Sequence, residues 1–315
     1  MREFIINNND AGQRVDKFLL KAVKRLPQSL MYKYIRLKRI KLNGKRCDIK
    51  TRLNEGDVLS LYINDEFFEE NKETDFLLAN ASIDIAYEDE NILVADKKPG
   101  LVVHEDNDHI ADTLINRIKN YLYKKGEYDP NDENSFAPSL CNRIDRNTQG
   151  LVVCAKNAQS LRILNEKIKN RELNKKYLCV CIGKFSKKSD TISAYHIKDE
   201  KNNTVKILPS PAYGAKKIVT GYNVLKEKDG LSLVEIALIT GRTHQIRAHM
   251  AYIGHPLLGD GKYGKNILNK KYHLKTQALC AYKLKFDFST DSGILGYLNG
   301  KEIISKEPWF VSELF

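Results

Sequence analysis

The stretch from Ile239 to Gly264, ITGRTHQIRAHMAYIGHPLLGDGKYG, combines the end of a strand, a turn and a helix in one segment. We predict that the strand ends at Thr240 and that the chain then turns. Thr243 is a residue type that can accept a hydrogen bond from a helix N-terminus. We therefore expect a helix from His244 to about Ile253, followed by a glycine of the kind that ends helices.

Two arginines stand at the start of this predicted helix. Arg242 precedes it, and Arg247 lies near its first turn. A helix N-terminus already carries partial positive charge, so cations there are unfavourable unless an anion compensates them. We expect an anion at this point, either a phosphate or a carboxylate such as Asp145.

Asp145 lies between two arginines in a second segment, NRIDRNTQG, residues 142–150. The guanidinium groups of Arg143 and Arg146 are expected to favour the ionised carboxylate. An ionised carboxylate can act as a nucleophile, a base or an electrostatic stabiliser, but not as a general acid. Gly150 can adopt a backbone conformation that other residues avoid. From these residues alone a structural ion cluster is the simpler interpretation, and catalysis is the alternative.

A third segment, KKYLCVCIG, residues 175–183, has the composition of a buried strand. In a strand Tyr177, Cys179 and Cys181 share one face, and the intervening aliphatic residues share the other. The Tyr177 ring could pack in the core or stack on a nucleic-acid base.

Three histidines near the predicted helix raise the question of a metal site. His244, His249 and His255 follow the spacing H-x4-H-x5-H, which is not the i, i+4 pair of a helical zinc site. We expect hydrogen-bonding or packing roles for them, with no metal and no cofactor.

The 315-residue chain has a net charge of +12 that is unevenly distributed. Residues 14–52 contain fourteen Lys and Arg against two acids, whereas residues 53–91 contain twelve acids against one Lys. The excess of positive charge indicates a polyanionic partner. We find neither a signal peptide nor an apolar run of about 20 residues, so we expect a cytoplasmic protein that does not enter a membrane.

The N-terminal part has the pattern of two short helices followed by a small sheet. Apolar residues at helical spacing predict one helix over 14–26, Pro27 ends it, and a second helix precedes a strand and a turn at Asn43-Gly44. Residues 64–80 are acidic and are expected to form a linker. The cations expected to contact RNA in this part are Lys17, Lys21, Lys24, Arg25, Lys33, Arg36, Arg39, Lys41, Lys45 and Arg46.

Short apolar runs interrupted by helical patterns follow from residue 83 onward. The runs NILVADK, GLVV, LVVCAK, YLCVCIG, LSLVEIALIT and AYKLKFDF are predicted strands, and residues 158–169 are a predicted helix. We expect an α+β protein: a small α/β RNA-binding domain (residues 1–63), the acidic linker (64–80) and a larger catalytic domain (81–315). The larger domain should contain a mixed, largely antiparallel central sheet flanked by helices.

The three quoted segments together resemble the signature segments of the RluA-type pseudouridine synthases, and residues 14–44 resemble an S4 RNA-binding domain. The subgroup of ribosomal large subunit pseudouridine synthases C and D is the one the chain resembles. The resemblance implies that Asp145 is the essential aspartate, that Arg143 holds the extruded nucleotide, that Tyr177 stacks near the target base, and that Arg247 is the basic partner of the aspartate. Arg242 and His244 are expected to contact RNA beside them. Asn142 and Gln149 depart from the family pattern, so the resemblance does not identify the exact subgroup or the target uridine.

The reaction that the resemblance implies isomerises a uridine within RNA to pseudouridine, without a cofactor. It further implies a monomer acting on large-subunit (23S) ribosomal RNA. Two alternatives from other classes are a non-catalytic S4-type assembly factor that only binds RNA and a glycoside hydrolase. The glycoside hydrolase would need a second catalytic carboxylate at a suitable separation, and none stands out in the sequence.

Overall fold

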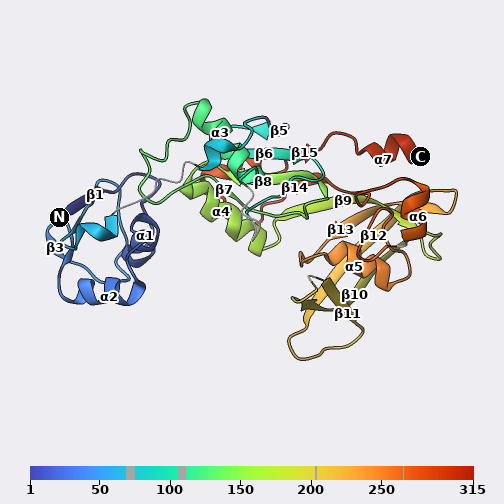
Figure 1. Ribbon diagram of the computed structural model, residues 1–315, viewed down its shortest axis with the longest axis horizontal. Helices are drawn as coiled ribbons and strands as arrows, with labels where there is room; N and C mark the ends of the chain where they lie inside the picture. Colours follow the sequence, from blue (N-terminus) through green and yellow to red (C-terminus); the bar gives the residue numbers. More distant parts are fainter. Residues whose placement is uncertain (69–74, 106–110, 203, 265) are drawn as a thin grey trace.

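The structure, a computed structural model, describes residues 1–68, 75–105, 111–202, 204–264 and 266–315. Its N-terminal part, drawn in blue at one end of the molecule in Figure 1, is a small sheet packed against two helices. The sheet is antiparallel, with strand order β1-β4-β2-β3. Its elements are β1 (Arg2–Ile5), α1 (Val15–Ala22), α2 (Gln28–Arg36), β2 (Ile40–Leu42), β3 (Lys45–Arg46) and β4 (Val58–Leu61).

The first helix is shorter than its apolar pattern predicts. It ends at Ala22 rather than at residue 26, and a turn closed by the bond from Leu26 N to Val23 O follows it. Pro27 restricts the backbone of the residue before it and disfavours helical conformation there. Val23 and Leu26 still reach the core, which explains why the pattern continues past the end of the helix.

The larger part of the chain is built on one long sheet with strand order β11-β10-β12-β13-β9-β14-β8-β6-β5. Among the described residues, β14 and β8 form its one parallel pair, and its other strand pairs are antiparallel. Its strands are β5 (Ile85–Glu88), β6 (Ile92–Lys97), β7 (Ser139–Leu140), β8 (Gln149–Ala155), β9 (Leu173–Ile182), β10 (Ser189–Asp199), β11 (Thr204–Leu208), β12 (Lys216–Lys228), β13 (Leu231–Leu238), β14 (Leu279–Phe286) and β15 (Glu302–Ile304).

Helices cover both faces of the β6–β8 end of this sheet. Helix α3 (Leu114–Lys124) packs on one face and α4 (Ala158–Lys169) on the other, each starting at a side-chain cap, Thr113 and Asn157 respectively. The prediction of a helix over 158–169 is confirmed. The predicted strand GLVV, residues 100–103, is wrong: the carbonyl oxygens of Val102 and Val103 accept hydrogen bonds from the first amides of α3 instead of from a strand.

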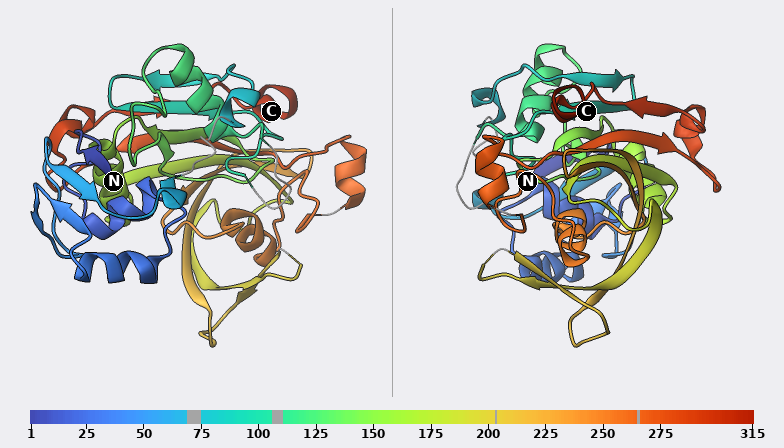
Figure 2. Two further views of the ribbon diagram at one scale, coloured as in Figure 1. Left: turned by 60° about the vertical axis from the view of Figure 1, so that its left-hand side comes forward. Right: turned by 90° about the vertical axis from the view of Figure 1, so that its right-hand side faces the viewer.

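Strand β9 buries both of its faces, as its sequence predicts. Tyr177, Cys179 and Cys181 lie in one core cluster with α5 (Gln245–Tyr252), and Leu178 and Val180 lie in another with α7 (Trp309–Leu314). Figure 2 shows β10, β12 and β13 curving around α5, which occupies the concave side of the sheet. The short helix α6 (Asn266–Lys271) precedes β14.

The acidic segment 64–80 is not one uniform connector. Its first part, the 3-10 turn η1 (Asp65–Phe68), packs on the N-terminal core, and its last part, η2 (Asp75–Leu78), packs on α3 through the buried ring of Phe76. Residues 69–74 lie outside the described residues. The domain limits 1–63, 64–80 and 81–315 therefore stay a prediction.

The two parts also touch directly, through polar groups. Ser135 Oγ donates to Asp10 at 2.6 Å, Asn134 Nδ2 donates to the same carboxylate at 2.7 Å, and Arg162 donates to Ala11 O at 2.9 Å. The core clusters of the two parts have no residue in common. The contact consists of hydrogen bonds between surfaces, so it does not merge the two parts into one core.

The architecture confirms the predicted fold class: α+β, with a small domain followed by a mixed, largely antiparallel sheet flanked by helices. In the part of the chain that the structure describes, no helix has the length and apolar character that a membrane span requires.

Candidate active site

Asp145 lies in the loop between β7 and β8, and hydrogen bonds hold this loop in place. Its carbonyl oxygen accepts from Thr148 N at 3.0 Å, and the carbonyl oxygen of Arg146 accepts from Gly100 N at 2.9 Å. Gly150, the second residue of β8, has φ +115°, and a Cβ there would lie 2.3 Å from Ala281 O. Only glycine allows β8 to approach β14 this closely, which fixes where the loop ends.

A buried lysine joins this loop to the segment after β6. Lys97 Nζ donates to three backbone carbonyls, those of Arg146 at 2.8 Å, Lys98 at 2.9 Å and Leu101 at 3.0 Å. Burial lowers the pKa of Lys97, and the Asp145 carboxylate opposes that effect. Three carbonyl acceptors match the three donors of an ammonium group, so Lys97 ties together two loops that border the site.

Arg247, on the first turn of α5, links Asp145 to a second carboxylate. Its Nη1 donates to Asp145 Oδ2 at 2.7 Å, while Nε and Nη2 donate to Asp260 Oδ2 and Oδ1 at 2.7 and 2.9 Å. Burial works against the charge, but the two carboxylates raise the pKa of Arg247 above its ordinary value. The planar fork of an arginine leaves little freedom in such a geometry, so Asp260 orients Arg247 and Arg247 orients Asp145.

Asp260 is fully buried and satisfied within the turn that follows α5. Its Oδ1 also accepts from the backbone amides of Lys262 at 2.8 Å and Tyr263 at 3.1 Å. Burial alone would raise the pKa of Asp260, but the hydrogen bonds and charge of Arg247 lower it below its ordinary value. The aspartate therefore remains ionised as a fixed anchor for the arginine.

His244 lies beside the same pair, with Nε2 3.9 Å from Asp145 Oδ2. The Tyr263 hydroxyl accepts from Val205 N at 2.8 Å, so its own proton is available to His244 Nδ1, which lies 2.9 Å away. The other ring nitrogen, Nε2, faces Asp145. Burial lowers the pKa of His244 despite the opposing charge of Asp145, which favours the neutral ring at pH 7.

Tyr177, on β9, has only 5% of its surface exposed. It lies in the wall of a cavity that Asp145 also lines. Among the described residues its hydroxyl has no hydrogen-bond partner. Burial raises the pKa of Tyr177, and the charge of Asp145 raises it further. The Tyr177 hydroxyl is therefore neutral at pH 7, although a buried tyrosine hydroxyl usually has a hydrogen-bond partner.

The two arginines next to Asp145 in the sequence do not pair with it in the described structure. Arg146 donates its Nε to Gly100 O at 3.1 Å, and Arg143 is exposed at the edge of the cavity. The direct ion-pair partner of the Asp145 carboxylate is instead Arg247, 102 residues away. The anion expected beside Arg247 is present, in the form of Asp145 and Asp260.

The start of α5 also differs from its prediction. The helix begins at Gln245, and His244 occupies the N-cap position in the left-handed region with φ 51°. Thr243 does not cap the helix. The Gln245 side chain instead accepts from Arg242 N at 3.1 Å and from the Thr240 hydroxyl at 2.9 Å. These bonds close the turn and direct the His244 ring toward Asp145.

The cavity lined by Asp145, Tyr177, His244 and Arg247 has a volume of about 640 Å³. Its wall combines the loop at 141–146, the segment at 102–105, β9 and the first turn of α5. A volume of this size accommodates a nucleotide.

His249 and His255 do not line the cavity. His249 hydrogen-bonds to Thr220, and His255 stacks on Phe185. The expected hydrogen-bonding and packing roles of these two histidines are confirmed.

The cations proposed for RNA binding in the N-terminal domain are exposed, apart from Lys41, which is half-buried beside Tyr62. Lys17 and Lys21 project from α1, and Lys33 and Arg36 from α2. Arg39, Lys45 and Arg46 lie on or beside the strands that follow, and Lys24 and Arg25 lie in the turn between the helices. Arg242 is exposed at the edge of the cavity, whereas His244 lies within it.

Three residues of the site, Asp260, Lys97 and Tyr263, are not among the predicted site residues. Asp260 and Tyr263 lie in the tail GDGKYG of the opening segment, and Lys97 lies in the segment DKKPG. The positive charge expected at the start of α5 could have predicted a second carboxylate such as Asp260, because a buried arginine needs more than one acceptor. No local pattern indicates that Lys97 is buried among carbonyls.

Comparison with known proteins places this geometry in a family. A family model described as RNA pseudouridylate synthase matches residues 91–252, and an S4 domain model matches residues 13–59. The chain belongs to the RNA pseudouridine synthase family. It is an isomerase that converts uridine in RNA to pseudouridine, as expected from its sequence.

Relatives cover nearly the whole chain. An RNA pseudouridine synthase of Mycoplasma genitalium is 37% identical over 90% of this chain and 88% of its own length. The ribosomal large subunit pseudouridine synthase D of Borreliella burgdorferi is 34% identical over 80% of this chain and 75% of its own length. The solved human RNA pseudouridylate synthase domain containing 1 has the same fold, with a TM-score of 0.57 and 23% identity over 74% of this chain and 86% of its own.

Family membership decides between the three classes considered from the sequence. A non-catalytic assembly factor and a glycoside hydrolase would each require a different family assignment over residues 91–252. The S4 match confirms an RNA-binding module in the N-terminal part.

Proposed function

We propose that this synthase isomerises specific uridines in large-subunit (23S) ribosomal RNA, with Asp145 as its essential catalytic residue. One observation carries the residue assignment: a carboxylate with about a quarter of its side chain exposed points into a nucleotide-sized cavity, where Arg247 holds it at 2.7 Å. A carboxylate that only stabilised the fold would not need to face the cavity. Its position allows contact with a bound nucleotide.

The chemistry requires one carboxylate and no added group. The N1 glycosidic bond breaks, the uracil turns, and C5 bonds to the sugar, with loss of the C5 proton and gain of one at N1. The product has the same atoms as the substrate, so neither an oxidant nor a cofactor is needed. Asp145 can attack the sugar, attack the uracil or remove a sugar proton, and all three roles require an ionised, oriented carboxylate.

Neighbouring side chains divide the remaining tasks. Arg247 orients Asp145 and is itself held by Asp260. The Tyr177 ring, in the wall beside Asp145, stacks near the target base, and Arg143, at the edge of the cavity, holds a phosphate of the extruded nucleotide. A base inside a paired helix cannot reach such a cavity, so the target uridine is flipped out or lies in a loop.

The N-terminal domain supplies affinity and placement. Its exposed cations on α1, α2 and the following strands contact phosphates without reading the sequence of bases. Large-subunit ribosomal RNA is proposed because relatives along most of the chain are named ribosomal large subunit pseudouridine synthases D and C. We further propose that the protein acts as a monomer in the cytoplasm.

The test uses the purified full-length protein with transcripts of large-subunit and small-subunit ribosomal RNA. Pseudouridine is detected by carbodiimide labelling and primer extension, and the unchanged mass of the RNA confirms isomerisation. We expect stops at a few positions of the large-subunit transcript that are absent with the Asp145→Asn variant. Modification of the small-subunit transcript alone would contradict the proposed RNA, and an active Asp145→Asn variant would contradict the proposed residue.

A further inference from the structure

A second hollow, of about 650 Å³, adjoins the active-site cavity. It lies where β9 and β13 separate. The register between these strands ends at Lys176 and Ala237, after which Leu173–Lys175 and Leu238–Gly241 line opposite sides of the opening. We call this opening the strand wedge. Ile168, Lys175, Leu238 and Gly241 line both hollows, so the wedge directly adjoins the active-site cavity.

The lining of the strand wedge is strongly cationic. It contains five basic side chains, Arg171, Lys175, Lys176, Lys283 and Lys285, against the single acid Glu302. Two of the five are neutralised locally, because Lys176 pairs with Glu235 at 2.8 Å and Lys283 pairs with Glu302 at 3.0 Å. Arg171, Lys175 and Lys285 have no ion pair among the described residues, so the lining keeps an excess of positive charge.

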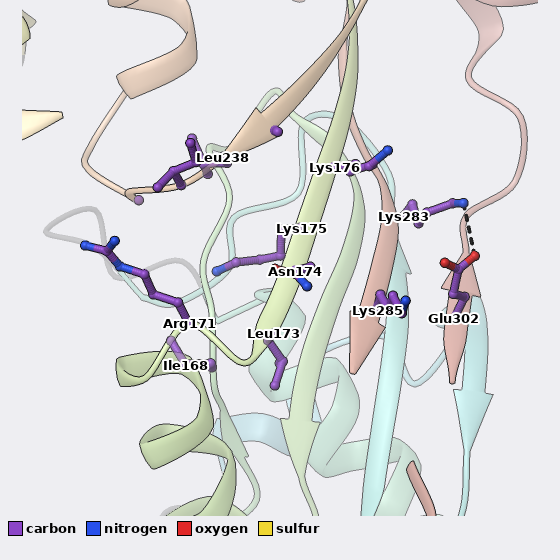
Figure 3. A pocket seen from close by; sticks show the side chains of 13 residues that line it. Ile168, Arg171, Leu173, Asn174, Lys175, Lys176, Leu238, Lys283, Lys285 and Glu302 are labelled. Carbon is purple, nitrogen blue, oxygen red and sulfur yellow. Dashed lines mark hydrogen bonds and ion pairs between the residues drawn. The ribbon is translucent and has the colours of Figure 1, made fainter. Parts of the chain in front are cut away.

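Lys175 stands out among these cations. It is half-buried at the junction of the two hollows, and among the described residues its ammonium group has neither a hydrogen bond nor an ion pair. Figure 3 shows Lys175 and Arg171 extending to the same side, whereas Lys176 and Lys283 point to the other. Burial lowers the pKa of Lys175, and no described carboxylate offsets that effect. Desolvating a cation without a partner is unfavourable, so the position favours an external anion.

We propose that the strand wedge binds the sugar-phosphate backbone of the RNA strand next to the target uridine, with Lys175 on a phosphate adjacent to that nucleotide and Arg171 on a phosphate further along. This inference rests on the proposed function, because the wedge adjoins the cavity that would hold the uridine. A polyanion is the class of ligand that fits an opening next to the active site whose lining includes cations without ion pairs among the described residues. The wedge is far in the sequence from the S4 domain and forms a separate contact with the RNA.

The experiment measures binding rather than turnover. A stem-loop RNA that contains the target uridine is titrated with Asp145→Asn protein, so that no product forms, over a range of salt concentrations. Adding Lys175→Met should weaken binding about tenfold and make the slope of log affinity against log salt shallower by about 0.7 to 0.9, the release expected for one phosphate contact. Lys175→Arg keeps the charge and should restore most of the affinity. Lys187→Met is the matched control, because Lys187 already pairs with Asp190 at 2.9 Å outside the wedge.

A second arm identifies the phosphate. Stem-loops carrying one neutral methylphosphonate at each linkage around the uridine are compared in a double-mutant cycle with Lys175→Met. At the contacted linkage the neutral RNA should bind the unsubstituted protein about as weakly as the charged RNA binds Lys175→Met, and the two changes together should add nothing. Additive effects at every linkage, an unchanged salt slope or an equal loss with Lys187→Met would each overturn the proposal. Because affinity is the readout, loss of activity in Asp145→Asn tests the proposed function separately.

Discussion

Positive charge is used in opposite ways in the two parts of this molecule. Arg247 is buried, and each of its three side-chain nitrogens donates to one of two carboxylates at 2.7 to 2.9 Å. Lys17, Lys33 and Arg36 in the N-terminal domain are exposed, and no hydrogen bond or ion pair of their side chains is present among the described residues. A buried, paired cation determines geometry, whereas an exposed one contributes attraction that salt weakens. The two parts should therefore respond very differently to loss of a single charge.

The largest effect is expected at Asp145. Asp145→Asn keeps the size of the side chain and one acceptor for Arg247, but it removes the charge that the reaction needs. We expect turnover below about a thousandth of the wild-type value, with RNA affinity unchanged or slightly higher, because one negative charge in the cavity is lost. Single-turnover assays and RNA titrations measure the two quantities. Turnover above that level would show that Asp145 is not essential.

The next largest effect is expected at Arg247, and it should include stability. Arg247→Met leaves the fully buried Asp260 without its cation, which typically costs about 3–5 kcal/mol. Asp145 also loses the donor that orients it, so turnover should fall by at least about a hundredfold. Calorimetry of the unfolding transition and single-turnover assays measure the two losses.

The double variant Arg247→Met/Asp260→Asn separates the two consequences. It removes the buried anion together with its partner, so we expect much of the lost stability to return while turnover stays low. A double variant with wild-type turnover would mean that Arg247 does not orient Asp145. A single variant as stable as the wild type would mean that the buried pair is not structural.

The difference between local and long-range interactions explains which features could be predicted from the sequence. The helix at 158–169 and the two faces of β9 follow from capping residues and from periodicity, which depend on neighbours along the chain. Asp145 and Arg247 could be proposed as a pair because the start of α5 needs an anion, and a family resemblance pointed to the same residues. The pairing of Arg247 with Asp260 and the burial of Lys97 depend on how the turn after α5 and the loop after β6 pack.

Local patterns were misleading where tertiary bonds replaced the expected ones. Residues 100–103 are apolar enough for a strand, but their carbonyls are used by α3. Thr243 is a good capping residue, but the Gln245 side chain closes the turn and His244 takes the left-handed position. In both places the backbone groups bond to a partner other than the one that the local pattern predicts, and such partners cannot be inferred from spacing.

A moderate effect is expected when several exposed cations of the N-terminal domain are removed together. Replacing Lys17, Lys21, Lys33 and Arg36 by Gln removes up to four phosphate contacts without disturbing the core. The slope of log affinity against log salt should become shallower by up to about four, and binding of long ribosomal RNA should weaken strongly at low salt. The single-turnover rate at saturating RNA should stay close to that of the wild type. An unchanged slope would mean that this surface does not touch RNA.

The smallest effect is expected for one exposed cation, and it gives the sharpest comparison with Arg247. Lys33→Gln removes one charge, as Arg247→Met does, but it leaves no buried partner behind and changes no contact of the site. We expect a loss of affinity of a few-fold at low salt, a slope shallower by about 0.9 at most, and no change in the melting temperature or in the single-turnover rate. Lys187→Gln, which removes a lysine paired with Asp190 on another surface, is the control and should leave the slope unchanged. A fall in the single-turnover rate of Lys33→Gln at saturating RNA would mean that the two parts act together during catalysis, through the polar contacts of Asp10 and Ala11 rather than through affinity alone.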